Sequence, residues 1–303
     1  MPLKLTILGS GSAVPNLNRG VTAQFLNFNE RRILIDCGEG TQLQLRRFKV
    51  KFQRLQYVFI SHLHGDHFLG LFGLVSSMSL LGRTKKLKIF APEGLEEVVR
   101  HQFKVTNVYL DFELEFITVK TKAKTLIFED NSIEVYALPL KHRAECYGYL
   151  FNEKEKDLNI DKSRIKEFKL TLDEILAAKR GEDVERKDKV IPNSDITLTP
   201  EPLASYAFCT DTSYIPHLAD WIKNVRLLYH EATFTNAHLK RAKATGHSTA
   251  EQAALIAIAA GAEQLILGHF SSRYKETSAL LEEAKPIFDK VLCVEDGQSF
   301  HLK

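Results

Sequence analysis

The chain has 303 residues, of which 44% are hydrophobic, so it is long enough to bury the core of one large α/β domain or of two small ones. Its 41 lysines and arginines nearly balance 38 aspartates and glutamates, which leaves a net charge of only +3. This balance excludes polyanion binding through overall charge, so any such binding must come from local patches.

The first residues, "MPLKLTILGSGSAV", contain an apolar stretch that glycines interrupt, unlike the apolar core of a signal peptide. No segment reaches the roughly 18 apolar residues that span a bilayer. The four cysteines are far apart and form no CxxC pair, which is typical of a reducing compartment: Cys37, Cys146, Cys209 and Cys293. We therefore expect a cytoplasmic protein without a membrane segment.

Short apolar runs separated by turns predict strands in the first half of the chain, at residues 3–9, 23–28, 31–38, 57–62, 87–92 and 132–140. Helices are expected after residue 67 and over residues 94–103, which follow Pro92. The strand pattern returns at residues 205–211, 225–232 and 263–270. Strands that alternate with helices predict a mixed α/β fold.

Residues from about 153 to 200 differ from this pattern because they are rich in charge and poor in large apolar side chains. We predict that they form an inserted arm outside the main core. Within it, "LTLDEILAAKR" carries four apolar residues at roughly helical spacing, which predicts a short helix: Leu170, Leu172, Ile175 and Leu176.

The last clear helix signal is "GHSTAEQAALIAIAAGA". Ser248 and Glu251 have the spacing of a capping box, and Gly261 is a C-terminal stop signal. His247 should therefore lie just before a helix N-terminus, whose free N–H groups and dipole suit a phosphate or an oxyanion.

The stretch "SHLHGDHFLG" carries the strongest chemical signal, since it places His62, His64, Asp66 and His67 within six positions just after the apolar run of residues 57–60. A single histidine at a strand end, such as His142 or His269, is more often only hydrogen-bonded, and Asp211 alone would be a turn residue. Loops have no structural reason to concentrate imidazoles, however, so the group predicts a metal site. Mixed imidazole and carboxylate ligands favour zinc, with manganese or iron as alternatives.

The HxHxDH pattern of residues 62–67 resembles the signature of the metallo-β-lactamase superfamily. Further segments resemble its ribonuclease Z branch, the tRNA 3′-processing endonucleases: "GSGSAVPNLNRG", "DCGEGTQ", "HEATF", "GHST" and "GHFSSRY". The resemblance covers nearly the whole chain in order. It implies a single domain over residues 1–303, an α/β four-layer αββα sandwich with the arm inserted at about 153–200.

The resemblance also implies a ligand set for two Zn²⁺ ions per chain. His62, His64 and His142 would hold one ion, Asp66, His67 and His269 the other, and Asp211 would bridge them. A water between the metals would attack the phosphodiester, with Asp66 as proton acceptor. Glu231 and His247 would serve the leaving oxygen; without the resemblance, a loop salt bridge would be the plainer interpretation of that pair.

On the same resemblance the substrate is precursor tRNA, cut to leave a 3′-hydroxyl on the tRNA and a 5′-phosphate on the trailer, and the protein is a homodimer. The implied RNA contacts are Arg19, Lys179, Arg180, Ser271 and Arg273. Two departures affect these contacts. Gly20 stands where the family usually has asparagine, and the arm lacks the Gly-Pro tip of many bacterial members. The arm's charged residues could equally form a solvated surface.

Two other classes of function stay open. A small-molecule hydrolase of the same fold, such as a phosphodiesterase, lactonase or β-lactamase, would need neither the arm nor "HEATF" and "GHST". A non-catalytic RNA-binding module would not need every ligand position to be filled. The number of independent matches favours the endonuclease.

Overall fold

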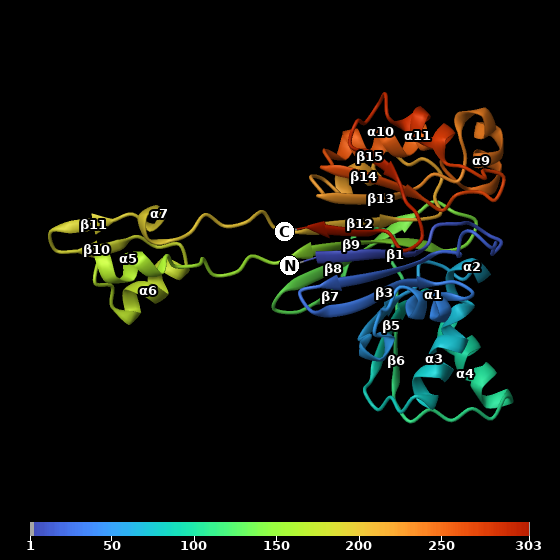
Figure 1. The fold of residues 1–303 in the computed structure, drawn as a ribbon, viewed down its shortest axis with the longest axis horizontal. Coiled ribbons are helices and arrows are strands. Elements are labelled where there is room, and N and C mark those ends of the chain that lie inside the picture. The colour runs from blue at the N-terminus through green and yellow to red at the C-terminus, as the bar shows by residue number, and fades with distance from the viewer. Residues whose placement is uncertain (1–2, 303) are drawn as a thin grey trace.

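The computed structural model describes residues 3–302, and its body consists of two seven-stranded sheets packed face to face (Figure 1). The first sheet has the strand order β16 (Ser299–Leu302), β1 (Leu3–Gly9), β2 (Ala23–Phe28), β3 (Arg31–Cys37), β4 (Tyr57–Phe59), β5 (Leu87–Ala91), β6 (Leu114–Thr118). The second has the order β15 (Val291–Cys293), β14 (Gln264–Gly268), β13 (Leu227–Glu231), β12 (Ser205–Cys209), β9 (Cys146–Glu153), β8 (Ile133–Leu140), β7 (Thr125–Glu129).

The inner faces of the two sheets share one apolar core. Phe59 of β4 stacks on Phe90 of β5 and meets Tyr149 and Phe151 of β9 edge-on. These rings are buried because alternate residues of each strand point inward. The strands predicted from apolar runs are confirmed, with ends shifted by up to three residues.

Helices cover both outer faces, which completes the predicted four-layer αββα sandwich (Figure 1). The first sheet is covered by α1 (Thr41–Arg47), α2 (Gly65–Phe68), α3 (Gly70–Leu80) and α4 (Leu95–Val105), over a second apolar cluster. The other sheet carries α8 (Leu218–Trp221), α9 (Leu239–Thr245), α10 (Ala250–Ala260) and α11 (Ser278–Ala284). Short 3₁₀ turns lie at Phe52–Arg54 and Asn236–His238. None of the helices within residues 3–302 has the length and apolar character needed to cross a membrane.

Strand direction determines where the loops meet. Strands β3 to β6 run parallel in one sheet, and β12 to β15 run parallel in the other. The carboxyl ends of parallel strands lie at the same edge of a sheet. The loops after β12, β13 and β14 therefore meet at one edge of the second sheet, and the loop after β4 lies beside them, with His62 Nε2 3.6 Å from Asp211 Oδ2.

The inserted segment projects from the body on two extended connections and folds separately (Figure 1). It contains α5 (Lys162–Glu167), α6 (Leu172–Lys179), β10 (Val184–Arg186), β11 (Lys189–Ile191) and α7 (Asn193–Ile196). Its small core consists of Leu170, Ala178, Val184, Ile191 and Ile196. The expected helix is present, but its apolar stripe is divided: Leu170 precedes the helix and is buried, whereas Leu172 is 70% exposed.

The predicted capping box of the last long helix is wrong by one residue. Thr249 is the N-cap of α10 and exchanges hydrogen bonds with Gln252, so this pair forms the box. The Ser248 hydroxyl instead donates to the backbone carbonyl of Thr212. Gly261 ends the helix with a positive φ of 65°, as predicted.

Candidate metal centre

The loop after β4 carries the metal-binding pattern, and close backbone packing holds it in place. Gly70, at the junction of α2 and α3, lies directly against the loop after β3: a Cβ at this position would stand 2.0 Å from the carbonyl oxygen of Gly38. Only glycine permits this approach. His62 and His67 are fully buried as a result.

Three histidines and one carboxylate oxygen form the first ligand group. The Nδ1 atom of His64 lies 2.9 Å from Nε2 of His62 and 3.3 Å from Nε2 of His142. The Asp211 Oδ2 atom is 3.6 Å from Nε2 of His62 and 3.7 Å from Nε2 of His142. These four side chains could hold one metal ion.

The second group lies on the other side of Asp211. Asp66 Oδ2 is 3.4 Å from Nε2 of His67 and 3.5 Å from Nε2 of His269. The second oxygen of Asp211, Oδ1, lies 3.4 Å from the same His67 nitrogen and 3.1 Å from that of His269. Each oxygen of Asp211 thus faces one group.

These spacings fit tetrahedral metal shells. Ligand atoms at about 2.0–2.1 Å from a zinc ion lie roughly 3.3–3.4 Å apart. Among the described side chains, the buried Nε2 atoms of His67 and His269 have no hydrogen-bond partner, although both point at carboxylates. Unpartnered buried nitrogens are uncommon in folded proteins. The cluster therefore fits a divalent metal site.

The charges of the cluster also suit a cation. Burial lowers the pKa of His62 well below its usual value, and the neighbouring His67 adds to this effect, so His62 is neutral as a metal ligand must be. Around His67 stand three acidic side chains, Asp36, Asp66 and Asp211. Buried carboxylates need a positive partner, which a divalent ion would supply.

The second ring nitrogen of three candidate ligands is also fixed. Asp36 Oδ2 lies 2.7 Å from Nδ1 of His67, and Ser61 Oγ lies 3.0 Å from Nδ1 of His62. The Gly246 carbonyl accepts from Nδ1 of His142 at 2.9 Å. Such partners orient metal-binding imidazoles. None of these three partners was predicted from the sequence, although Asp36 opens "DCGEGTQ".

Glu231 and His247 form a pair beside the cluster. Nδ1 of His247 donates to Glu231 Oε1 at 2.9 Å. Burial lowers the pKa of His247, but the Glu231 carboxylate outweighs burial and raises it to about 9. A third possible ligand group joins Asp211, His247 and His269. Nδ1 of His247 lies 3.9 Å from Asp211, but it already donates to Glu231 and so is not free to bind a metal ion.

The candidate ligands open into a cleft of about 230 Å³, and Ser12 and Ala13 of the N-terminal loop also line it. The backbone N–H of Ala13 donates to Asp66 Oδ2 at 2.7 Å. Ala13 has a positive φ of 59°, a conformation that costs energy for a residue with a side chain. This contact was not visible in the sequence, because it depends on a loop more than 50 residues away from Asp66.

The candidate RNA contacts fall into two separate places. Arg19 donates to the carbonyls of Tyr274 and Lys275, at 2.7 and 3.1 Å, so it joins the N-terminal loop to the loop after β14. Arg273 donates to Ser271 Oγ at 3.1 Å in that same loop. Two further candidates, Lys179 and Arg180, lie in the arm instead, at the end of α6.

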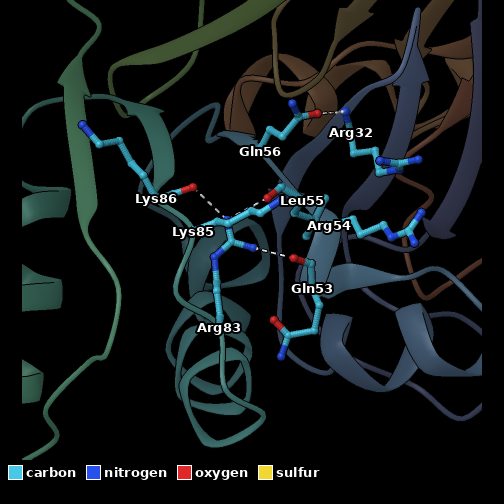
Figure 2. Close-up of a pocket in the computed structure, with 8 residues that line it drawn as sticks. All are labelled: Arg32, Gln53, Arg54, Leu55, Gln56, Arg83, Lys85 and Lys86. Carbon is cyan, nitrogen blue, oxygen red and sulfur yellow. Dashed lines mark hydrogen bonds between the residues drawn. The ribbon is translucent and has the colours of Figure 1, made fainter.

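A larger basic cavity, of about 730 Å³, is separate from the cluster of candidate ligands (Figure 2). Its lining includes Gln56, which precedes β4, whereas His62 follows this strand, so cavity and cluster lie at opposite ends of β4. The buried Arg83 donates to the carbonyls of Gln53, Leu55 and Lys86 and so holds the loops together. The lining contains no carboxylate, histidine or cysteine that could bind a metal.

The αββα sandwich, with a histidine and aspartate cluster at the carboxyl ends of its strands, defines a metallo-β-lactamase-fold protein. Two solved structures agree. The human tRNase Z short form (ELAC1) is 27% identical, with a TM-score of 0.72 and 99% of both chains covered. The metallo-β-lactamase fold protein YhfI of Bacillus subtilis is 19% identical, with a TM-score of 0.68 and 98% of both chains covered, which supports the fold alone.

Sequence comparison identifies the branch. Residues 3–176 match the family model described as Anti-Pycsar protein Apyc1, a match that ends inside the arm. Ribonuclease Z of Bacteroides thetaiotaomicron is 44% identical over 295 residues, which cover 97% of this chain and 93% of the relative. Ribonuclease Z of Porphyromonas gingivalis is 40% identical, with 98% of both chains covered. The chain belongs to the ribonuclease Z family.

Proposed function

We propose that the protein is a zinc-dependent endoribonuclease that removes the 3′ trailer from precursor tRNA, leaving a 3′-hydroxyl on the tRNA and a 5′-phosphate on the trailer. The observation that carries this proposal is the Glu231–His247 pair, held at 2.9 Å beside the ligand cluster in a chain that is 44% identical to a ribonuclease Z. A small-molecule phosphodiesterase, the alternative left open by the sequence, is not favoured by relatives that match along the whole chain.

The residues divide into three chemical roles. One zinc ion would be held by His62, His64 and His142, and the second by Asp66, His67 and His269. Asp211 would contact both ions. Two bound zinc ions would lower the pKa of a water and offset negative charge on the phosphate. Asp66, whose Oδ2 atom lies 3.4 and 3.5 Å from Nε2 of His67 and His269, would also accept the proton of the attacking water.

His247 would act on the opposite side of the phosphate. Its Nδ1 is occupied by Glu231, which leaves Nε2 as the atom that can donate a proton to the departing 3′ oxygen. The Glu231 carboxylate raises the pKa of His247 to about 9, which favours the protonated ring that a general acid requires. Glu231 acts by orientation and charge, because it is fully buried and cannot reach the RNA.

The arm, residues 153–200, would bind the tRNA away from the cleavage site. Arg180 and Arg186 are paired with Glu182 and Glu174. The lysines of the arm, Lys179 among them, are therefore the better phosphate ligands. Arg19, Ser271 and Arg273 would instead position the acceptor end near the cleft.

We also propose a cytoplasmic homodimer. All four cysteines, each within the described residues, are free thiols, as in proteins of reducing compartments. Leu80 and Leu81 at the end of α3 are 87% and 61% exposed, and Leu43 on α1 is 67% exposed, which is typical of a surface that a second subunit covers.

Cleavage of a precursor tRNA with a 3′ trailer, labelled at its 5′ end, tests the proposal. With zinc present, the expected product has one new 3′ end at the tRNA boundary and carries a hydroxyl, which a 3′-specific ligation detects. A chelator-treated sample and an Asp211→Ala variant are the controls. An intact precursor, together with rapid hydrolysis of bis(p-nitrophenyl) phosphate, would instead support a small-molecule phosphodiesterase.

A further inference from the structure

We infer that Thr233 is a positioning residue which links the leaving-group pair to the second metal group through one hydroxyl. The inference rests on the proposed function. Thr233 lies two residues after the end of β13 and is 3% exposed. Its Oγ1 atom is 2.5 Å from Glu231 Oε2 and 2.9 Å from Nδ1 of His269.

The direction of these hydrogen bonds follows from the donors available. Glu231 Oε1 accepts from the backbone N–H of Thr212 and from Nδ1 of His247, and Oε2 accepts from the backbone N–H of Thr233. The Thr233 hydroxyl has a single proton and donates it to Oε2. Its oxygen must then accept from Nδ1 of His269, so the His269 proton lies on Nδ1.

This arrangement has two consequences for the site. With the proton on Nδ1, the lone pair of His269 lies on Nε2, the atom that faces Asp66 and Asp211. The same hydroxyl also fixes the orientation of the Glu231 carboxylate through Oε2. The other carboxylate oxygen, Oε1, orients His247. The hydroxyl also lies 3.4 Å from Nδ1 of His247, too far to displace Glu231 as its partner. The second ligand group and the Glu231–His247 pair therefore both depend on the Thr233 side chain.

Substitution by valine tests this, since valine keeps the branched shape and removes the hydroxyl. We expect Thr233→Val to weaken zinc binding by about 10- to 100-fold at the second ligand group, which contains His269. Loss of an outer partner of a metal ligand typically has an effect of this size. Competition with a chromophoric chelator measures this affinity without any RNA. Thr233→Ser retains the hydroxyl and should bind zinc like the natural protein. Thr235→Val is the matched control, because its hydroxyl is also buried but faces Tyr274.

Cleavage of precursor tRNA supplies the second readout. Thr233→Val should lower kcat strongly in the natural background and much less in a His247→Ala background, because the two substitutions disrupt the same pair. Unchanged zinc affinity in Thr233→Val, additive losses, or a Thr233→Ser variant as defective as Thr233→Val would each overturn the inference. If Thr233→Val does not fold, Thr233→Ala replaces it with the same expectations. A natural protein that binds zinc but cuts no precursor tRNA would contradict the proposed function alone, since the zinc affinities still test Thr233.

Discussion

His247 and Asp66 both line the cleft at the ligand cluster and differ in one respect that can be measured. Asp66 Oδ2 faces two candidate ligand histidines, at 3.4 and 3.5 Å, whereas Nδ1 of His247 is occupied by Glu231. Loss of Asp66 should therefore affect metal binding and chemistry together. Loss of His247 should affect chemistry alone.

We expect His247→Ala to retain its zinc and to cleave precursor tRNA roughly 10²- to 10⁴-fold more slowly, the range typical of a lost general acid. The loss should be much smaller on bis(p-nitrophenyl) phosphate, because p-nitrophenolate leaves without a proton. Asp66→Ala should be impaired on both substrates. Steady-state rates on the two substrates, with zinc analysis of each variant, measure these effects.

His101→Ala is the control for this prediction, since His101 is an exposed residue of α4 outside the site. The role proposed for His247 is wrong if its alanine variant loses zinc, or if both substrates are affected to the same degree.

At this scale, the sequence predicted the residues that the structure brings together in the ligand cluster but not those that orient them. His62, His64, Asp66 and His67 are close in sequence, so one loop shows them together. Asp36 and Thr233 are an ordinary aspartate and threonine until the fold places them 2.7 and 2.9 Å from the ring nitrogens of two histidines.

Among the elements, helix α6 of the arm depends on a carboxylate with several partners. Glu174 completes a capping box with Thr171 and accepts two hydrogen bonds from Arg186. The hydrogen bonds from Arg186 and from the Thr171 backbone lower the pKa of Glu174 from 4.5 to about 2. A carboxylate with a lowered pKa stabilises the fold above its unfolded pKa and loses this effect as the pH falls.

We therefore expect the amides of α6 to lose protection from hydrogen exchange, relative to the rest of the arm, as the pH falls from about 4.5 to 2. Glu174→Gln should be less protected at neutral pH and should lack this pH dependence. Glu182→Gln is the control, because Glu182 pairs with Arg180 but caps no helix. An equal pH dependence in both variants would contradict the role of Glu174.

The base of the arm permits a clean test of its function. Glu153 donates its backbone N–H to the carbonyl of Ala204 at 2.9 Å, so the two ends of the insertion are hydrogen-bonded neighbours on antiparallel strands. Residues 155–202 can thus be replaced by a short Gly-Asn turn without altering the sheet. Removing the whole unit avoids exposing its core.

We expect this armless variant to bind precursor tRNA at least about tenfold more weakly and to hydrolyse bis(p-nitrophenyl) phosphate at the natural rate. The log-log dependence of binding on salt should flatten by about 0.9 or less for each lost phosphate contact. Filter binding at several salt concentrations measures both quantities. Equal loss of binding and of ester hydrolysis would mean that the arm is structural.

The elements that could be predicted from the sequence are those with strong local patterns. Strands β1, β2 and β3 are short segments rich in apolar residues between turns, and their predicted bounds agree with the structure to within one residue. Strand β7 could not be predicted, because it is an edge strand with little burial. The core of the arm was missed because its apolar residues are scattered singly over residues 170–196.

For the whole molecule, we predict two zinc ions per chain in metal analysis of the purified protein. A His64→Ala, His67→Ala double variant should lose zinc, whereas His101→Ala should retain it. Chelation should lower the Tm, because the buried carboxylates lose their positive partner and because bound metal at 100 times its Kd adds about 2.7 kcal/mol of stability. A stoichiometry near one, or full zinc in the double variant, would refute the proposed ligand set.

The proposed ligands come from both sheets, and this spread along the chain has a consequence for biosynthesis. His62 to His67 follow a strand of the first sheet, whereas His142, Asp211 and His269 follow strands of the second. Neither zinc shell can be completed until Asp211 has left the ribosome, and the second also requires His269. On this ligand set, zinc enters only after the two sheets have docked, so a truncated or misfolded chain in the cell would not sequester the metal and would not acquire nuclease activity.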